Sequence, residues 1–292
     1  MKGEEADMMD PERTDPETTD PERRGGTESV RAPDVGAAEN GFTADVALGA
    51  GATAALVETA SRFRDADLAG WSLCDGWSRG HVLAHVSRNA DALLRLARWA
   101  STGVPEEMYP GGATARDAEI EAGAARPVRE HVADLRATAD ELGRAFDRLA
   151  AAFSTGGPAA AEVEGRGGYR ISSGGLPFVR LREVVYHHVD LDAGFTFEDV
   201  HPDLLGRFLD DAVSRLALAG RPPALVLAAD DGGRWTVGGA GPAAPSRTSP
   251  PRSGDPAGVV CGSRAGLLMW LARRREDGIR SQRPVPSLPR GA

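Results

Sequence analysis

Apolar residues recur every three or four positions in four stretches of the first two-thirds of the chain, the spacing of an amphipathic helix that packs on one side. Ser78 is placed to cap the second stretch, and Pro127 and Pro177 stand at first-turn positions of the third and fourth. Four helices of this length, joined by loops, predict a helical bundle. The expected helices cover residues 42–69, 78–102, 127–153 and 177–193, with a loop or short hairpin at 165–175.

The pattern changes after residue 198. One more amphipathic helix is followed by short apolar runs that predict strands, and Ser263 can cap a last helix. These elements predict a small α/β domain at 199–278, so the fold class is α+β, with the bundle at 41–198 first. The expected elements are a helix at 202–219, strands at 224–228, 234–237 and 259–261, and a helix at 265–275. A Gly-, Pro- and Ser-rich loop at 238–257 and the tail at 279–292 are expected to be loose.

The first 40 residues have few large apolar side chains and carry a five-residue repeat that begins Asp10-Pro-Glu-Arg-Thr. Such a segment cannot bury enough apolar surface to offset its ordering entropy. We therefore expect a disordered acidic tail at 1–40, either solubilising or acting as a docking arm. It holds twelve acidic and five basic residues, a balance of −7, so the body of the chain carries only −2 of the total −9.

This charge distribution narrows the classes of partner. A near-neutral body without a basic cluster predicts no nucleic-acid binding. No apolar run reaches the ~18 residues that cross a bilayer, and no signal peptide is evident, so no membrane partner and a cytoplasmic location are expected. Cys74 and Cys261 lack the spacing of zinc sites or disulfide frameworks, which predicts plain thiols. The oligomeric state is left open, with a monomer allowed.

The fourth predicted helix carries Glu183, His187 and Asp190 at positions i, i+4 and i+7, which puts the three side chains on one stripe. Glu and His four residues apart can hold one metal ion, and a facing helix of a bundle can add His85. Two imidazoles and one carboxylate leave a coordination position open, as in catalytic zinc sites. Without a metal, the same spacing would be a surface or capping arrangement, and His85 a core histidine.

The same residues resemble a known family. The segment from Gly76 to Asp91, GWSRGHVLAHVSRNAD, and the segment from Leu181 to Leu191, LREVVYHHVDL, are similar to the mycothiol-dependent maleylpyruvate isomerase family. The C-terminal segment from Gly262 to Arg274, GSRAGLLMWLARR, is similar to the end of that family's second domain. The resemblance covers residues 45–276 and implies a DinB-like four-helix bundle.

By this resemblance, His85, Glu183 and His187 would bind Zn²⁺ or another divalent metal, and mycothiol would be the thiol cosubstrate. The family's arginine in the second domain maps onto Arg274, although Arg273 and Arg275 flank it. Asp190 would orient a ligand imidazole or relay a proton, or would be a charge at the helix end.

The implied activity is isomerisation of a small electrophile such as maleylpyruvate. Three alternatives stay open. The chain could be a mycothiol S-transferase in detoxification or in the biosynthesis of a sulfur metabolite. It could instead be a non-catalytic, metal-stabilised binding module, or a metal-dependent hydrolase with Asp190 as its base.

Overall fold

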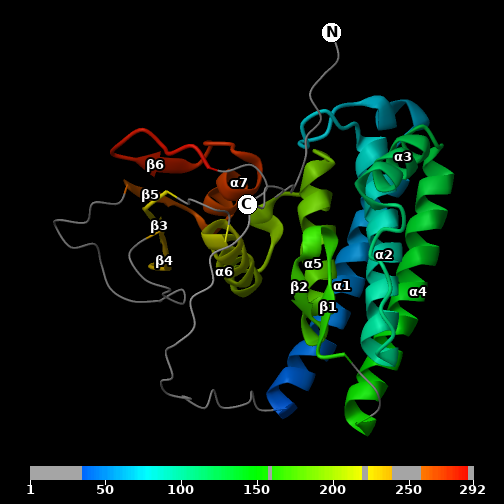
Figure 1. Cartoon of the computed structure of the whole chain (residues 1–292). Helices are drawn as coiled ribbons and strands as arrows, with labels where there is room; N and C mark the ends of the chain where they lie inside the picture. The colour runs from blue at the N-terminus through cyan, green and yellow to red at the C-terminus, as the bar shows by residue number, and fades with distance from the viewer. Residues whose placement is uncertain (1–34, 157–159, 219–222, 239–257, 289–292) are drawn as a thin grey trace, which may run out of the picture. The chain divides into compact units, whose positions relative to one another are not determined.

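The computed structural model describes residues 35–156, 160–218, 223–238 and 258–288 (Figure 1). Its helices come first and a small mixed sheet with its own helices follows, which confirms the predicted α+β class. The described chain forms two compact units: a helical unit of residues 35–70 and 78–187, and a sheet unit of residues 71–77 and 188–288. The division at 187/188 lies inside a helix, ahead of the boundary predicted at 198.

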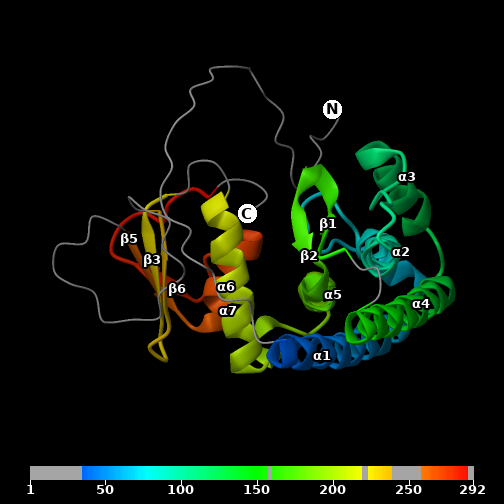
Figure 2. The same ribbon diagram turned by 60° about the horizontal axis from the view of Figure 1, so that its bottom comes forward.

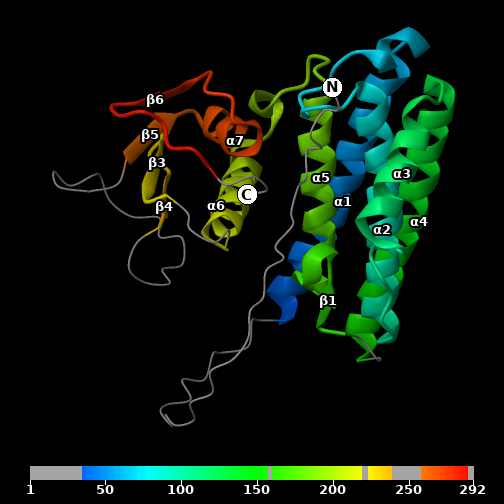
Figure 3. The same ribbon diagram turned by 45° about the horizontal axis from the view of Figure 1, so that its top comes forward.

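The helical unit is built around four long helices, with a shorter one beside them. Within it, α1, α2 and α4 lie side by side and α3 runs along α2 (Figure 3). The elements are α1 (Val35–Ser61), η1 (Asp65–Ala69), α2 (Arg79–Thr102), α3 (Gly112–Ala124), α4 (Val128–Thr155), β1 (Glu162–Glu164), η2 (Arg166–Gly168), β2 (Arg170–Ser172), η3 (Ser173–Gly175) and α5 (Leu176–Asp190), the last three residues of α5 being grouped with the sheet unit.

Apolar side chains from every long helix fill the core of this unit. Leu93 and Leu96 of α2, Phe146 and Leu149 of α4 and Leu176 of α5 are all almost fully buried in one cluster. Burial of such a side chain stabilises the fold by about 1.5–3 kcal/mol relative to leaving it in water. This core therefore fixes the position of α2 relative to α5, the two helices that carry the predicted metal ligands.

Two expectations about this unit were wrong. The chain at 35–40 continues α1 rather than forming part of a disordered tail, whereas residues 1–34 lie outside the described part. Residues 112–124 form α3 where a loop was expected. Helix α3 approaches α2 closely because Gly80 lacks a side chain: a Cβ there would lie 2.2 Å from the carbonyl oxygen of Ala124. The hairpin of β1 and β2 realises one of the two forms expected near 165–175.

The sheet unit is a four-stranded mixed sheet in the order β4-β3-β5-β6. Strand β3 pairs antiparallel with β4 and parallel with β5, and β5 pairs antiparallel with β6. Helices α6 and α7 pack on one face of it (Figure 2). The elements are η4 (Phe197–Asp199), α6 (Pro202–Leu218), β3 (Leu225–Ala229), β4 (Arg234–Val237), β5 (Gly258–Gly262), α7 (Arg264–Arg273) and β6 (Ile279–Ser281).

Most elements of this unit follow the predictions, including the Ser263 cap of α7, whose side chain accepts a hydrogen bond from the Gly266 amide. The tail at 279–292 was expected to be loose, but residues 279–281 add β6 to the edge of β5, because Val260 and Ser281 pair across the two strands. The loop predicted at 238–257 lies outside the described residues beyond Gly238. Among the described helices, none combines the length and the apolar composition of a membrane span.

Candidate metal centre

The predicted ligands meet inside the helical unit. His85 comes from the middle of α2, and Glu183 and His187 come from consecutive turns of α5. Glu183 Oε2 lies 3.5 Å from His85 Nε2 and 3.6 Å from His187 Nε2, and the two imidazole rings meet edge to face with centroids 4.5 Å apart. Three side chains from two helices thus present their ligand atoms to one point.

The spacing of these atoms fits a tetrahedral divalent cation. With metal–ligand bonds of about 2.0–2.2 Å, tetrahedral geometry separates neighbouring ligand atoms by roughly 3.3–3.6 Å. The two measured separations agree with that range, and the ligand atoms of all three residues lie within 4.8 Å of one another. The donor set is that of zinc-type sites: two imidazole nitrogens and one carboxylate oxygen.

The protonation states also suit metal binding. Burial, reinforced by the neighbouring His187, lowers the pKa of His85 to about 3, so its imidazole is neutral at neutral pH. Burial acts to raise the pKa of Glu183, but the imidazoles of His187 and His85 and the Arg182 guanidinium hold that pKa well below its ordinary range. The site therefore offers a neutral imidazole and an ionised carboxylate, the forms that ligate metals.

A buried arginine that the sequence did not single out adjoins the site. Arg116 of α3 places Nη2 3.3 Å from His85 Nδ1, and its guanidinium lies 5.7 Å from the ring centroid of Tyr109. Arg116 also donates to Asp117 through Nη1. Burial raises the pKa of Tyr109, while Arg116 opposes that rise. The metal ligands thus have the guanidinium of Arg116 and the phenol of Tyr109 as neighbours. These two residues lie on a helix and a loop that the apolar periodicity of the sequence did not predict.

A second buried arginine lies one turn before Glu183 on α5. Arg180 Nη1 donates to the carbonyl oxygen of Val86 at 2.8 Å and to Asn89 Oδ1 at 2.9 Å, which ties α5 to α2 beside His85. Its side chain is 4% exposed. Burial lowers the pKa of Arg180 to about 10, and the charge of Glu183 opposes that shift. Such cross-helix hydrogen bonds fix the distance between the two helices that carry the ligands.

Asp190 and Arg274, the two further residues predicted for the site, lie in the sheet unit. The carboxylate of Asp190 is almost fully buried and accepts hydrogen bonds from both Nε and Nη2 of Arg273, and the Cys74 thiol lies 3.2 Å from its Oδ2. Arg274 follows the end of α7 with a φ of 57° and donates to the carbonyl oxygen of Leu271. Asp190 thus binds Arg273, whereas the sequence analysis singled out the adjacent Arg274.

The other histidines have local roles. His81 Nδ1 lies 2.7 Å from the Ser78 hydroxyl at the start of α2, and its Nε2 lies 3.0 Å from Glu121 of α3. His131 is buried on α4, whereas His201 is exposed on the sheet unit. His188 stacks on Phe195 with parallel rings 4.0 Å apart. None of the four belongs to the cluster of His85, Glu183 and His187.

Two comparisons with known proteins find similarity to one family. The family model described as the mycothiol maleylpyruvate isomerase N-terminal domain matches residues 50–192. The structure is similar to the crystal structure of a mycothiol-dependent maleylpyruvate isomerase, with a TM-score of 0.70 and 29% identity over 85% of this chain and 96% of that one. A histidine-to-alanine mutant of such an enzyme matches with the same TM-score and coverage and 28% identity. No curated protein sequence matches the chain. Residues 50–192 therefore match the model of the mycothiol maleylpyruvate isomerase N-terminal domain, in agreement with the resemblance found in the sequence.

Proposed function

We propose that the protein is a mycothiol-dependent enzyme that binds one divalent metal, Zn²⁺ in the simplest case, through His85, Glu183 and His187. The observation that carries the proposal is the convergence of these three ligand atoms at tetrahedral spacing. A divalent cation held there would lower the pKa of a bound thiol, which makes the thiolate available at neutral pH. The similarity to a mycothiol-dependent isomerase supports mycothiol as that thiol.

The residues of the chain have separate tasks in this proposal. His85 and His187 supply imidazole nitrogens, and Glu183 supplies the one negative charge among the ligands. The substrate is a small electrophile such as maleylpyruvate, to whose conjugated carbon the thiolate adds. In isomerisation, rotation about the resulting single bond and elimination of the thiol yield the trans isomer and return mycothiol. In an S-transferase the carbanion of the adduct is protonated and the thiol stays attached.

The roles derived for Asp190 and Arg274 remain proposals. Asp190 lies one turn beyond His187 on α5, and its carboxylate accepts a hydrogen bond from Arg273. We propose that this bond fixes the end of α5 and thereby helps to position His187. Arg274 is the candidate for holding a substrate carboxylate, for which a guanidinium is suited. An Arg274→Ala variant should then raise KM for a carboxylate substrate more than it lowers kcat, and an unchanged KM would remove Arg274 from this role.

The decisive experiment uses two histidines of the same helix. Wild-type protein, His85→Ala and His81→Ala are purified, their bound metal is quantified, and maleylpyruvate is followed by NMR with and without mycothiol. His81 lies one turn from His85 and contacts Ser78 and Glu121, so it is the matched control. The proposal expects metal and turnover in wild type and His81→Ala, and neither in His85→Ala. Retention of metal by His85→Ala would overturn the ligand assignment.

The fate of the thiol separates the candidate activities. Mycothiol that is regenerated while the trans isomer accumulates indicates an isomerase, whereas stoichiometric loss of mycothiol into a conjugate indicates an S-transferase. A metal-loaded protein that accelerates neither reaction favours the binding module. Turnover that needs metal but not mycothiol would contradict the proposal and favour a hydrolase.

A further inference from the structure

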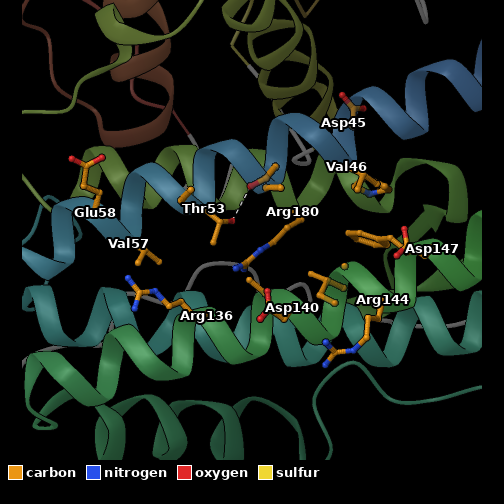
Figure 4. Close-up of a pocket in the computed structure, with 18 of the residues that line it drawn as sticks. Asp45, Val46, Thr53, Val57, Glu58, Arg136, Asp140, Arg144, Asp147 and Arg180 are labelled. Carbon is orange, nitrogen blue, oxygen red and sulfur yellow. Dashed lines mark hydrogen bonds between the residues drawn. The ribbon is translucent and has the colours of Figure 1, made fainter.

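A cavity lies in the helical unit. It has a volume of about 810 Å³ and opens between α1 and α4, with Arg180 of α5 in its wall (Figure 4). Ligand pockets typically enclose about 300–1,000 Å³. None of the three metal ligands lines it. Its existence follows from small residues on the facing helices, of which Gly49 and Ala54 on α1 and Ala139 and Gly143 on α4 are examples.

The wall of this cavity contains an unsatisfied buried donor. Arg180 uses Nη1 for Val86 and Asn89, but its buried Nη2 has no hydrogen-bond partner. Figure 4 shows the Arg180 side chain between the ribbons of α1 and α4. A buried guanidinium donor without an acceptor destabilises the fold, because the desolvation penalty of a charged group is not compensated. An acceptor supplied from the cavity would remove that cost.

The charges around Arg180 indicate that the acceptor is an anion. Glu183 favours the charged form of Arg180 more than Tyr109 or Asp91 does, and Glu183 is also the only carboxylate of the proposed metal site. Once its charge is shared with a divalent cation, Arg180 is a buried cation beside another cation. Buried charges are stable only when they are paired, so a negative group at Nη2 would restore the balance.

The rest of the lining restricts the size and the charge of that anion. Apolar walls are supplied by Val46, Val57, Leu142 and Phe146. The lining also holds the buried Asp45, and the rim mixes the carboxylates of Glu58, Asp140 and Asp147 with Arg136 and Arg144. Rim carboxylates repel polyanions such as nucleotides, whereas a single buried guanidinium matches a single carboxylate. We propose that this cavity binds a monocarboxylate with an apolar tail, whose carboxylate pairs with Arg180 and whose tail lies between α1 and α4.

Octanoate serves as the probe, in calorimetric titrations of the full chain with and without metal. Gly143→Leu tests the site without touching a charge, because a Cβ at Gly143 meets nothing within 4 Å and a larger side chain would extend into the cavity. Gly51→Leu is the matched control: Gly51 lies on α1, has the same open surroundings and does not line the cavity. Arg180→Met removes the guanidinium, and circular dichroism checks that each variant is folded.

The proposal expects octanoate to bind wild type and Gly51→Leu equally, and Gly143→Leu and folded Arg180→Met about tenfold or more weakly, since a charge-assisted hydrogen bond or the space for the tail is lost. 1-Octanol should bind wild type about tenfold more weakly than octanoate does. Absence of octanoate binding to folded wild type, or binding that Gly143→Leu leaves unchanged, would overturn the proposal. Equal binding of octanol would also overturn it, because the guanidinium would then play no part.

Discussion

Replacing Arg116 with glutamine should tighten metal binding, although it removes a buried contact of a proposed ligand. A guanidinium has donors only, so Arg116 Nη2 at 3.3 Å requires His85 Nδ1 to act as the acceptor. A neutral imidazole with a free Nδ1 carries its proton on Nε2, the nitrogen that faces Glu183. A metal bound at Nε2 needs the proton on Nδ1 instead, and two donors would then face each other. Metal binding must therefore break the contact between Arg116 and His85.

The size of this effect follows from the contact that is lost. A hydrogen bond to a charged group contributes about 1.5–3 kcal/mol, and 3.3 Å is long for such a bond, so the lower end applies. Glutamine at position 116 removes the competing donor charge, and its side-chain oxygen can accept from Nδ1–H, which supports the ligating tautomer. A change of about 1.4 kcal/mol corresponds to a tenfold lower Kd for Zn²⁺.

The assay is a competition titration of Zn²⁺ against a chromophoric chelator at constant pH and ionic strength. Arg98→Gln is the matched control: it makes the same charge change at a half-exposed arginine that pairs with Glu106 on the surface. Its Kd should equal that of wild type. Nitrogen NMR of metal-free wild type should place the His85 proton on Nε2. A Kd that is unchanged or higher in Arg116→Gln, or an Nδ1 proton in the metal-free protein, would refute the reasoning.

Three further variants test the fold that supports the site. Gly80→Ala would bring a Cβ to within 2.2 Å of the Ala124 carbonyl oxygen, so we expect a loss of about 1–3 kcal/mol in urea unfolding; an unchanged midpoint would contradict the close helix approach. Burial lowers the pKa of His131, so the unfolded chain binds a proton at a higher pH than the folded chain does, and stability falls as the pH drops below about 6.5. The variant His131→Asn should make the free energy of unfolding less dependent on pH in urea titrations at pH 5–7. An equal slope in wild type and variant would contradict this. Asp190→Ala leaves the Arg273 guanidinium without its carboxylate, which should cost about 3–5 kcal/mol in thermal or urea unfolding, and a change below 1 kcal/mol would show that the pair is not structural.

The ends of α2 show what local sequence can predict. The Ser78 side chain accepts a hydrogen bond from the amide of His81, and Gly103 adopts a φ of 73° at the other end. Both helix caps depend on residues that are close in the sequence, so the local sequence is sufficient to predict them. The stripe of Glu183 and His187 on α5 is local in the same sense, because helical geometry alone puts positions i and i+4 on one face.

Helix α3 was missed because another kind of interaction holds it. Its buried residues are Arg116, Ile120 and Gly123, which do not form an apolar stripe. A Cβ at Gly123 would lie 2.9 Å from Ala84 Cβ, so close backbone approach to α2 positions the helix. Such an approach depends on two segments some 40 residues apart in sequence, and apolar periodicity does not report it. Because the sequence analysis did not predict α3, it also did not predict the contact between Arg116 and His85.

Arg273 and Arg274 show why a site residue cannot be chosen from spacing alone at the end of a helix. Helical geometry would separate the two side chains by about 100° around the axis. Helix α7 ends at Arg273, and Arg274 takes the left-handed conformation, which redirects its side chain toward the carbonyl oxygen of Leu271. Arg273 instead reaches a carboxylate 83 positions away in the sequence. Where the helix stops therefore decides which of two adjacent guanidinium groups reaches Asp190. That of Arg274 is redirected to a carbonyl oxygen of its own helix, whereas that of Arg273 pairs with Asp190.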